Sequence, residues 1–212
     1  MSTSYGQNWI PPMKRTKARL RILHMSVLYF LAAVGFVPCS RAQAPIFEIT
    51  PLNSWIKFHV KSSTTIAGKF DKWDASLTFK SPDETTGTLI INIEASSVDT
   101  GSGLKNGKLK SKDFFDVEQN PYIIFRSTKF VSTGPHTYEV DGDFTIRGVS
   151  APEKLTLTVS GKGTGSGEIH GAMVFNRKDY GMNKGIPFIK IADHVDVNFH
   201  LNWKHVSGPP LA

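Results

Sequence analysis

Alternating apolar and polar residues run through most of this chain. Residues 55–61 read WIKFHVK, in which isoleucine, phenylalanine and valine alternate with lysine and histidine. The same period of two recurs in residues 88–98, 137–147 and 191–203. Because successive side chains of a strand point to opposite faces, this pattern predicts half-buried β-strands.

Turn-forming residues separate these segments at short intervals, and about eight to nine strands fit the pattern. Such a series is typical of a β-sandwich or an up-and-down barrel. Closing the sheet would bury its apolar face and remove its exposed edges. The interior of an eight-stranded barrel holds either packed side chains or one ligand. The pattern leaves both alternatives open.

One stretch departs from the alternation and predicts a short helix inserted around residues 105–116, before a stop signal at Asn120–Pro121. It carries the adjacent apolar residues Phe114 and Phe115. Either this pair attaches the helix to the sheet, or the helix closes one end of a cavity. Four lysines also lie between positions 105 and 112. They form either a solvated basic face or a site for an anionic head group at the helix N-terminus.

Residues 1–44 form a separate segment with the order of a secretory signal peptide. Basic residues come first, then the apolar run 25–37, then the small-residue triplet AQA that ends at Ala44. The apolar run is shorter than the roughly 20 residues of a membrane-spanning helix. We therefore expect cleavage after Ala44, export to the periplasm and a single domain over residues 45–212.

The charge of the chain belongs to this leader. Six of the 25 lysines and arginines, but none of the 18 acidic residues, lie in it, so the domain keeps 19 basic and 18 acidic residues. A nucleic-acid-binding domain carries a basic face, and a net charge of +1 does not indicate one. The single cysteine, Cys39, also lies in the leader. The domain therefore has neither a disulfide nor thiolate chemistry.

Residues that carry enzymatic chemistry are sparse. The chain has no G-x-S-x-G, no H-E-x-x-H and no glycine-rich phosphate loop before a helix. His194 and His200 share a strand face, but six residues of strand separate them by about 20 Å. We therefore expect no catalytic residue, no metal site and no cofactor. A hydrolase of lipids or sugars, and an interaction module with a solid core, remain the alternatives.

Motifs along the domain, taken in order, resemble the YceI-like family. The matching stretches are SWIKF at 54–58, GKF at 68–70, SVDTG at 97–101, LKSKDFFD at 109–116, PYIIFRST at 121–128, GDFTIRGV at 142–149, RKDYGM at 177–182 and VDV at 195–197. The resemblance covers about residues 47–203. In one place the chain departs from the family, which commonly has an Arg-Asp pair followed by His where this sequence has Lys105, Asn106 and Lys108.

The resemblance implies an all-β, eight-stranded antiparallel lipocalin-like barrel with an elongated apolar pore. It implies binding of a polyisoprenoid, an isoprenoid quinone or a related long-chain lipid in the periplasm, without catalysis. The implied partner is thus a small-molecule lipid and not nucleic acid. A transient contact with a membrane or a b-type cytochrome, and a homodimer, stay open.

We therefore predict a ligand site that combines inward-facing strand residues with candidates near the mouth of the barrel. The predicted residues are Phe58, Leu89, Ile91, Ile93, Lys105, Lys108, Phe125, Tyr138, Val140, Phe144, Leu157, Phe175, Arg177, Tyr180, Val197 and Phe199.

Overall fold

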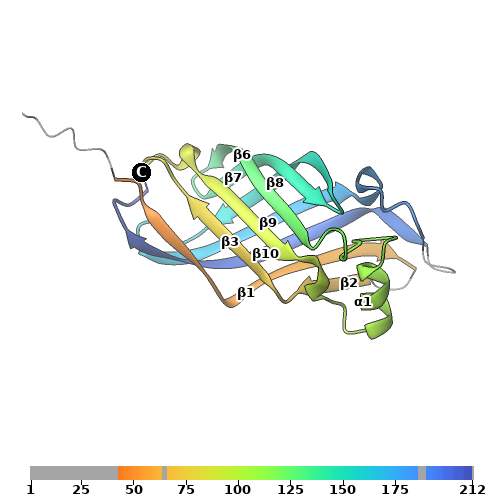
Figure 1. Cartoon of the computed structure of the whole chain (residues 1–212). Coiled ribbons are helices and arrows are strands. Elements are labelled where there is room, and N and C mark those ends of the chain that lie inside the picture. The colour runs from red at the N-terminus through yellow and green to blue at the C-terminus, as the bar shows by residue number, and fades with distance from the viewer. Residues whose placement is uncertain (1–42, 64–65, 186–189, 212) are drawn as a thin grey trace, which may run out of the picture. The chain divides into compact units, whose positions relative to one another are not determined.

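The computed structural model describes residues 43–63, 66–185 and 190–211, so the predicted leader lies outside the described residues except for its last two positions. Eight antiparallel strands close into a barrel, which confirms the predicted fold class. Closure comes from β1 (Ile46–Ser62), which pairs with β10 (Ile191–Ser207) at the other end of the strand order (Figure 1). Among the described residues, no helix is long and apolar enough to cross a membrane.

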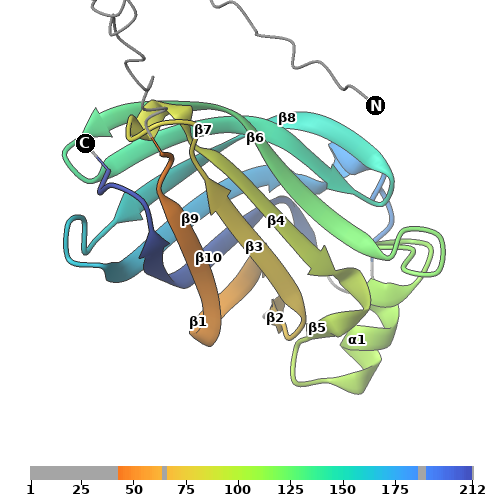
Figure 2. The same cartoon turned by 60° about the vertical axis from the view of Figure 1, so that its left-hand side comes forward.

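The remaining strands follow β10 around the barrel in a simple antiparallel order. They are β9 (Ser166–Asn176), β8 (Val149–Val159), β7 (Thr137–Ile146), β6 (Tyr122–Gly134), β4 (Thr88–Glu94) and β3 (Trp73–Thr78), while the short strands β2 (Ile66–Phe70) and β5 (Val98–Asp99) complete the sheet beside β1. Figure 2 shows the helix α1 (Gly103–Lys110) at one end of this barrel and the C-terminal residues at the other.

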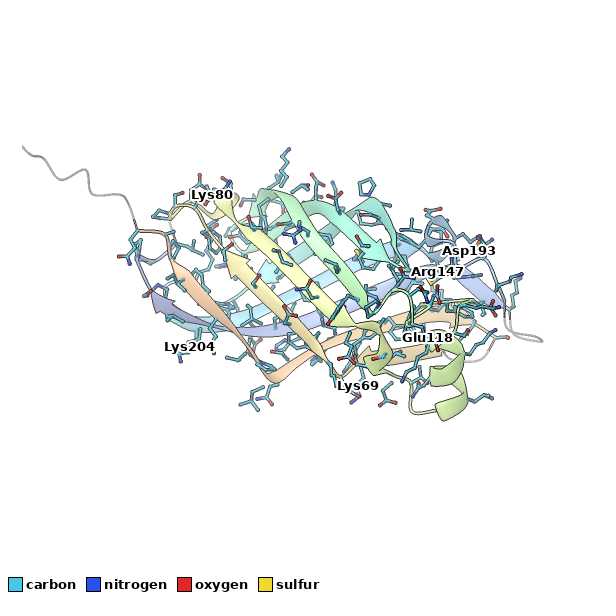
Figure 3. All side chains as sticks on the ribbon, viewed as in Figure 1. Lys69, Lys80, Glu118, Arg147, Asp193 and Lys204 are labelled. Carbon is cyan, nitrogen blue, oxygen red and sulfur yellow. The ribbon has the colours of Figure 1, made fainter. Side chains whose placement is uncertain are left out.

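The period of two correctly identifies which side chains point inward. In β4, Leu89, Ile91 and Ile93 are buried, whereas Ile90 and Asn92 between them are only partly buried. The charged side chains of Lys69, Lys80 and Lys204 lie on the outer surface, as Figure 3 shows. Burial of the alternate positions therefore follows directly from strand geometry.

Asn53 and Ser54 are residue types that predict a turn before the strand at 55–61, but β1 continues through them. The pairing of β1 with β10 shifts register between Thr50 and Trp55, and Asn53 has a left-handed φ of 59°. The Ser54 hydroxyl donates to the carbonyl of Thr50 at 2.5 Å and accepts from the backbone N–H of Asn202 at 2.9 Å. The polar residues thus form a bulge, which bends a long strand without breaking it.

The sequence of residues 68–79, GKFDKWDASLTF, predicts a single strand, and this prediction is wrong because the segment divides into β2 and β3. Residues 71 and 72 leave the ladder, and their backbones bond to the segment between β4 and β5 instead. The N–H of Asp71 donates to the carbonyl of Ser97 at 3.2 Å, and the carbonyl of Lys72 accepts from the N–H of Glu94 at 3.0 Å. The bend lets β2 pair with the second half of β1.

The helix begins and ends earlier than the predicted 105–116, since α1 covers Gly103–Lys110. After it the chain tightens into turns, in which Phe115 N–H bonds to Leu109 at 2.9 Å and Asp116 adopts a left-handed φ of 50°. These turns direct Phe114 and Phe115 into the core, where they are 5% and 7% exposed. A longer helix would not place two adjacent side chains on the same apolar surface.

Tightly packed side chains fill the middle of the barrel. This middle layer consists of Ile56, Ile91, Phe125, Val140, Met173, Phe199 and Leu201, all between 0% and 5% exposed. Two glycines make room for its rings. A Cβ on Gly142 would lie 2.5 Å from the Phe125 ring, and one on Gly171 would lie 2.0 Å from the Phe199 ring. Glycine therefore lets each phenylalanine lie against the backbone of a neighbouring strand.

Candidate functional site

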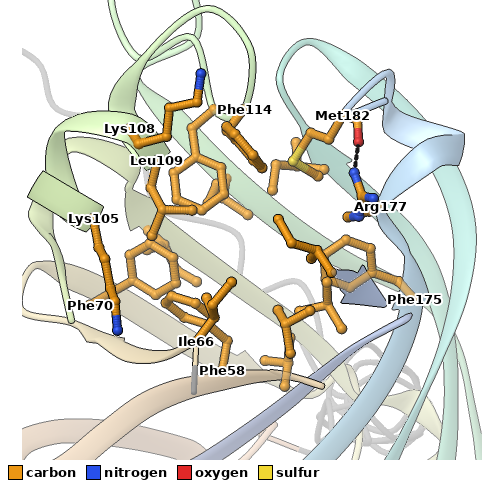
Figure 4. Close-up of a pocket in the computed structure, with 18 of the residues that line it drawn as sticks. Phe58, Ile66, Phe70, Lys105, Lys108, Leu109, Phe114, Phe175, Arg177 and Met182 are labelled. Atoms are coloured by element: carbon orange, nitrogen blue, oxygen red, sulfur yellow. Dashed lines mark hydrogen bonds between the residues drawn. The ribbon is translucent and has the colours of Figure 1, made fainter. Parts of the chain in front are cut away.

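A cavity of about 460 Å³ lies at the end of the barrel that carries α1. This volume falls within the range of small-molecule sites, about 300–1,000 Å³. Figure 4 shows side chains from β1, β2, β9 and α1, with Phe58, Phe70, Leu109 and Phe175 among them, surrounding it. Leu104 of α1 borders the same cavity and is 87% exposed, so the cavity reaches the surface beside the helix.

The described lining is apolar except for Ser102, Lys105, Lys108 and Arg177. The apolar lining residues are Phe58, Val60, Ile66, Phe70, Ile93, Leu104, Leu109, Phe114, Phe115, Ile123, Phe144, Ile146, Phe175, Met182, Ile191, Val195 and Val197. Aspartate, glutamate and histidine are absent from these described lining residues. Such a surface offers dispersion contacts and release of water rather than acid–base chemistry.

The helix and the turns that follow it form one wall of the cavity. Phe115 packs against Phe70 with ring centroids 6.0 Å apart, and Phe70 packs against Phe58 at 5.6 Å. The two interpretations of the Phe114–Phe115 pair therefore both apply. The pair attaches the helical segment to the barrel, and the same segment closes one end of a cavity.

Asn106 anchors α1 to the barrel and does not line the cavity. Its side-chain oxygen accepts from the backbone N–H of Thr100 at 2.8 Å and from the Thr100 hydroxyl at 2.7 Å. Its amide nitrogen donates to Asp99 at 3.4 Å. The departure from the family pattern at this position thus supplies helix anchoring rather than a polar group in the cavity.

The lysines of α1 form a positive rim. In Figure 4 the ammonium groups of Lys105 and Lys108 extend away from the apolar centre of the cavity. Lys108 Nζ lies 2.6 Å from Asp113 Oδ2, and both side chains are about one-third exposed. The hydrogen bond from Lys108 lowers the pKa of Asp113 below its ordinary value. Asp113 therefore offsets part of the positive charge at this rim.

Arg177 is the buried charged group of the cavity wall, at 6% exposed. Its Nε donates to the carbonyl of Ala192 at 3.1 Å, and its Nη1 donates to the carbonyls of Met182 and Lys184. Its Nη2 pairs with Asp193 at 3.2 Å. The guanidinium thus ties the segment after β9 to the start of β10, and its hydrogen-bonding positions are largely occupied by the protein.

The structure brings half of the sixteen predicted ligand residues to this cavity. The eight that line it are Phe58, Ile93, Lys105, Lys108, Phe144, Phe175, Arg177 and Val197. Four others, Ile91, Phe125, Val140 and Phe199, belong to the middle layer and line none of the three cavities described here. Leu89, Tyr138 and Leu157 line a small cavity nearer the opposite end.

Tyr180, the sixteenth residue, lies behind the cavity wall. It is fully buried between Phe144 and Phe175, with ring centroids 5.4 Å from each. Its hydroxyl donates to Glu153 at 2.9 Å. Burial raises the pKa of Tyr180, and the hydrogen bond to Glu153 raises it further. Its position is that of a support for two lining rings.

Several lining residues are missing from the sequence-based prediction, although some carried a signal. Val60 and Val195 share strand parity with the predicted Phe58 and Val197, so the alternation could have identified them. Met182 lies in an irregular loop without any period. Only the folded chain shows that this loop turns toward the barrel end.

The opposite end of the barrel holds a second cavity of about 300 Å³ beside a small one of about 40 Å³. Polar groups gather there. Lys162 forms an ion pair with Glu84 and donates to the Tyr138 hydroxyl at 3.0 Å, and that hydroxyl donates to Glu84 at 2.5 Å. Burial alone would lower the pKa of Lys162, but its hydrogen bonds to these two partners raise it.

Comparisons with known proteins agree with this architecture. A protein of Pseudomonas savastanoi pv. phaseolicola named UPF0312 protein is 29% identical over 139 residues, which span 63% of this chain and 72% of the relative. Among solved structures, Burkholderia cenocepacia BcnA matches with a TM-score of 0.66 at 24% identity, over 73% of this chain and 99% of that one.

A polyisoprenoid binding domain from Saccharophagus degradans matches with a TM-score of 0.59 at 15% identity, over 76% of this chain and 99% of that chain. At these identities the two structural matches support the fold alone. The sequence model of the YceI-like domain covers residues 47–203, which is well over half of the chain. This protein therefore belongs to the YceI-like family.

Proposed function

We propose that this protein is a periplasmic carrier that holds a long apolar lipid, of the polyisoprenoid or isoprenoid quinone type, in the cavity beside α1. The observation that carries the proposal is a cavity of about 460 Å³ with an apolar lining and a lysine rim. An apolar chain would occupy the interior, and its polar head would lie at the rim with Lys105 and Lys108.

Burial of the chain supplies the binding energy. Each methylene removed from water contributes about 0.8 kcal/mol. A tail with about ten buried carbons would gain roughly 8 kcal/mol before the costs of ordering and lost translation. The name of the Saccharophagus degradans neighbour, a polyisoprenoid binding domain, supports the same class of ligand.

The described lining also supports binding rather than catalysis. Hydrolysis of a lipid or sugar needs an activated nucleophile or two converging carboxylates. The polar lining residues are instead one serine, two lysines and an arginine already held by backbone carbonyls. A carrier without catalytic activity agrees with these side chains.

The exposed end of α1 provides a route for loading from a membrane. Leu104 is 87% exposed beside the cavity, and the same helix carries Lys105, Lys108 and Lys110. Lysines near a membrane surface are attracted to anionic lipids, and an adjacent leucine can enter the interfacial region. The contact would be transient, because a single short helix buries little area.

The direct test is mass spectrometry of organic extracts from the purified protein, followed by uptake of an added isoprenoid quinone. Val197→Trp narrows the cavity beside α1, and Val159→Trp narrows the opposite cavity with the same change in volume. Excluding about two methylenes costs near 1.6 kcal/mol, so Val197→Trp should weaken uptake at least about tenfold. Val159→Trp should leave uptake unchanged.

Two results would contradict this proposal. One is an extract without lipid from a protein that also takes up no added quinone. The other is an equal loss of uptake in both tryptophan variants, which would indicate general destabilisation. Export is tested separately, since N-terminal sequencing of periplasmic protein should begin at Pro45.

A further inference from the structure

The geometry points to a binding site for a divalent first-row transition-metal ion on the outer wall of the barrel. Glu168 and His170 of β9 and His200 of β10 form it. One ligand atom from each of the three side chains lies within 4.8 Å of those of the other two. The site faces solvent on the outer wall, so it is independent of the lipid cavity proposed above.

Antiparallel pairing brings these residues together. His170 and His200 are directly opposite each other in the β9–β10 ladder, although 30 positions separate them in the chain. Glu168 precedes His170 by two residues and therefore shares its face. Spacing within a single strand could not reveal this pair, because the ligands come from two strands.

The distances suit a tetrahedral ion. The Nδ1 atoms of His170 and His200 are 3.4 Å apart, whereas Glu168 Oε2 lies 3.3 Å from Nε2, the other ring nitrogen of His170. Zinc–nitrogen bonds of about 2.0–2.1 Å in a tetrahedron place neighbouring ligand atoms about 3.3–3.4 Å apart. The two Nδ1 atoms are thus at the separation that a shared ion requires, and Glu168 completes the site when its flexible side chain rotates from Nε2 of His170 toward this pair.

Neighbouring aromatic contacts restrict His200. Its ring stacks on Trp55 of β1 with centroids 5.9 Å apart and an interplanar angle of 19°, and it meets His170 at 4.5 Å on the other side. Lys57 Nζ lies 4.2 Å above the Trp55 ring. His170 and Glu168 side chains are 54% and 49% exposed, so an ion can enter from solvent. The site therefore combines one restricted ligand with two accessible ones.

The ligand types define the class of ion. Imidazole nitrogen suits zinc, copper, nickel and iron, whereas calcium and magnesium prefer sites made of oxygen. Two histidines and one carboxylate leave at least one coordination position for water or for a group from another molecule. Zn²⁺ and Cu²⁺ are the appropriate probes, and Cu²⁺ should bind more tightly in accordance with the general affinity order.

The test is calorimetric titration of the untagged protein with ZnCl₂, because a polyhistidine tag would itself bind the ion. We expect one Zn²⁺ per chain. Loss of an outer-shell partner typically weakens metal binding roughly 10–100-fold. His170→Ala and His200→Ala each remove a direct ligand, so each should weaken Zn²⁺ binding by more than that. Glu168→Gln should weaken it by about tenfold. His194→Ala is the matched control, since His194 lies exposed on the same strand opposite Asn176.

Tryptophan fluorescence gives a second readout of the position of the ion. Cu²⁺ at this site should quench Trp55, and Trp55→Phe should remove most of the quenching while keeping the stoichiometry. Saturable Zn²⁺ binding that survives in the His170→Ala/His200→Ala double variant would overturn the proposal. So would the absence of saturable Zn²⁺ binding to the unmodified protein.

Discussion

The two ends of the barrel are built from the same eight strands, yet they differ in what occupies them. The end beside α1 encloses about 460 Å³ with an apolar lining, and among the described lining residues charge appears only at the rim and at Arg177. The opposite end is divided into cavities of about 300 and 40 Å³, with a partly buried network of Glu84, Tyr138 and Lys162 beside them. The middle layer separates the two ends.

The difference teaches that a barrel interior is not uniform along its axis. Beside α1, the inward-facing strand residues border the cavity, and the helical segment forms one of its walls. At the opposite end, Phe47 packs edge-on against Trp203 and Phe79, with centroids 5.3 and 5.6 Å apart. The same inward-facing pattern therefore bounds one larger apolar cavity at the α1 end and two smaller cavities around a cluster of rings at the other end.

Removing a ring from the middle layer should break the separation between the ends. Phe125→Ala should destabilise the protein by about 3–5 kcal/mol, the range for deleting a buried phenylalanine, and should let longer chains bind. Urea unfolding and chain-length profiles of bound lipid measure these effects. Phe130→Ala on the same strand, which lines the small cavity, should destabilise without changing the preferred chain length.

Arg177→Ala should be the next largest effect and should act through stability. It removes donors from three backbone carbonyls and leaves Asp193 without this partner, so we expect a loss of about 3 kcal/mol in urea unfolding. Arg177→Lys should recover only part of it, because an ammonium cannot reproduce the planar fork. Unchanged stability with lost lipid uptake would instead assign Arg177 to the ligand.

The corresponding change at the opposite end is Lys162→Met. It leaves Glu84, whose side chain is 14% exposed, without its cation, and we expect a loss of about 2 kcal/mol. Lipid uptake should not change, since Lys162 does not line the cavity beside α1. Lys154→Met is the control, because this 56% exposed lysine forms a surface pair with Glu139 and should matter by less than about 0.5 kcal/mol.

The smallest expected effect concerns Glu153, which supports the cavity wall through Tyr180. Burial raises the pKa of Glu153, against the hydrogen bond from Tyr180, which lowers it. A carboxyl whose pKa is higher in the folded than in the unfolded protein stabilises the fold at a pH below its unfolded pKa, near 4.3. This contribution is lost as the pH rises through the pKa of the folded state. Glu153→Gln should remove this contribution to the pH dependence of the free energy of unfolding, which we expect to be less than about 1 kcal/mol.

Urea midpoints at pH 4 and pH 7 measure this contribution. As the pH rises from 4 to 7, the change in stability should be less favourable in the unmodified protein than in the Glu153→Gln variant. The same slope in both proteins would contradict a raised pKa for Glu153.

The alternation alone determined that the fold is all-β and identified most of the inward-facing residues, whereas the eight-stranded barrel was predicted from the family resemblance. Which face a side chain takes is a local property of a strand, so the contrast between Ile91 and Ile90 needs no tertiary contact. The bulge at Asn53, the break between β2 and β3 and the early end of α1 at Lys110 differ from the local prediction. In each, backbone bonds to distant or looped segments outweighed the local signal.

Tertiary structure alone decided which inward residues border a cavity. Phe125 and Phe58 have the same pattern in sequence, and each lies against a glycine of a neighbouring strand, Gly142 and Gly68, but Phe58 borders the cavity beside α1 and Phe125 does not. The meeting of His170 and His200 likewise depends on the register between two strands. Periodicity specifies a face, but the volume behind that face depends on residues far away in the chain.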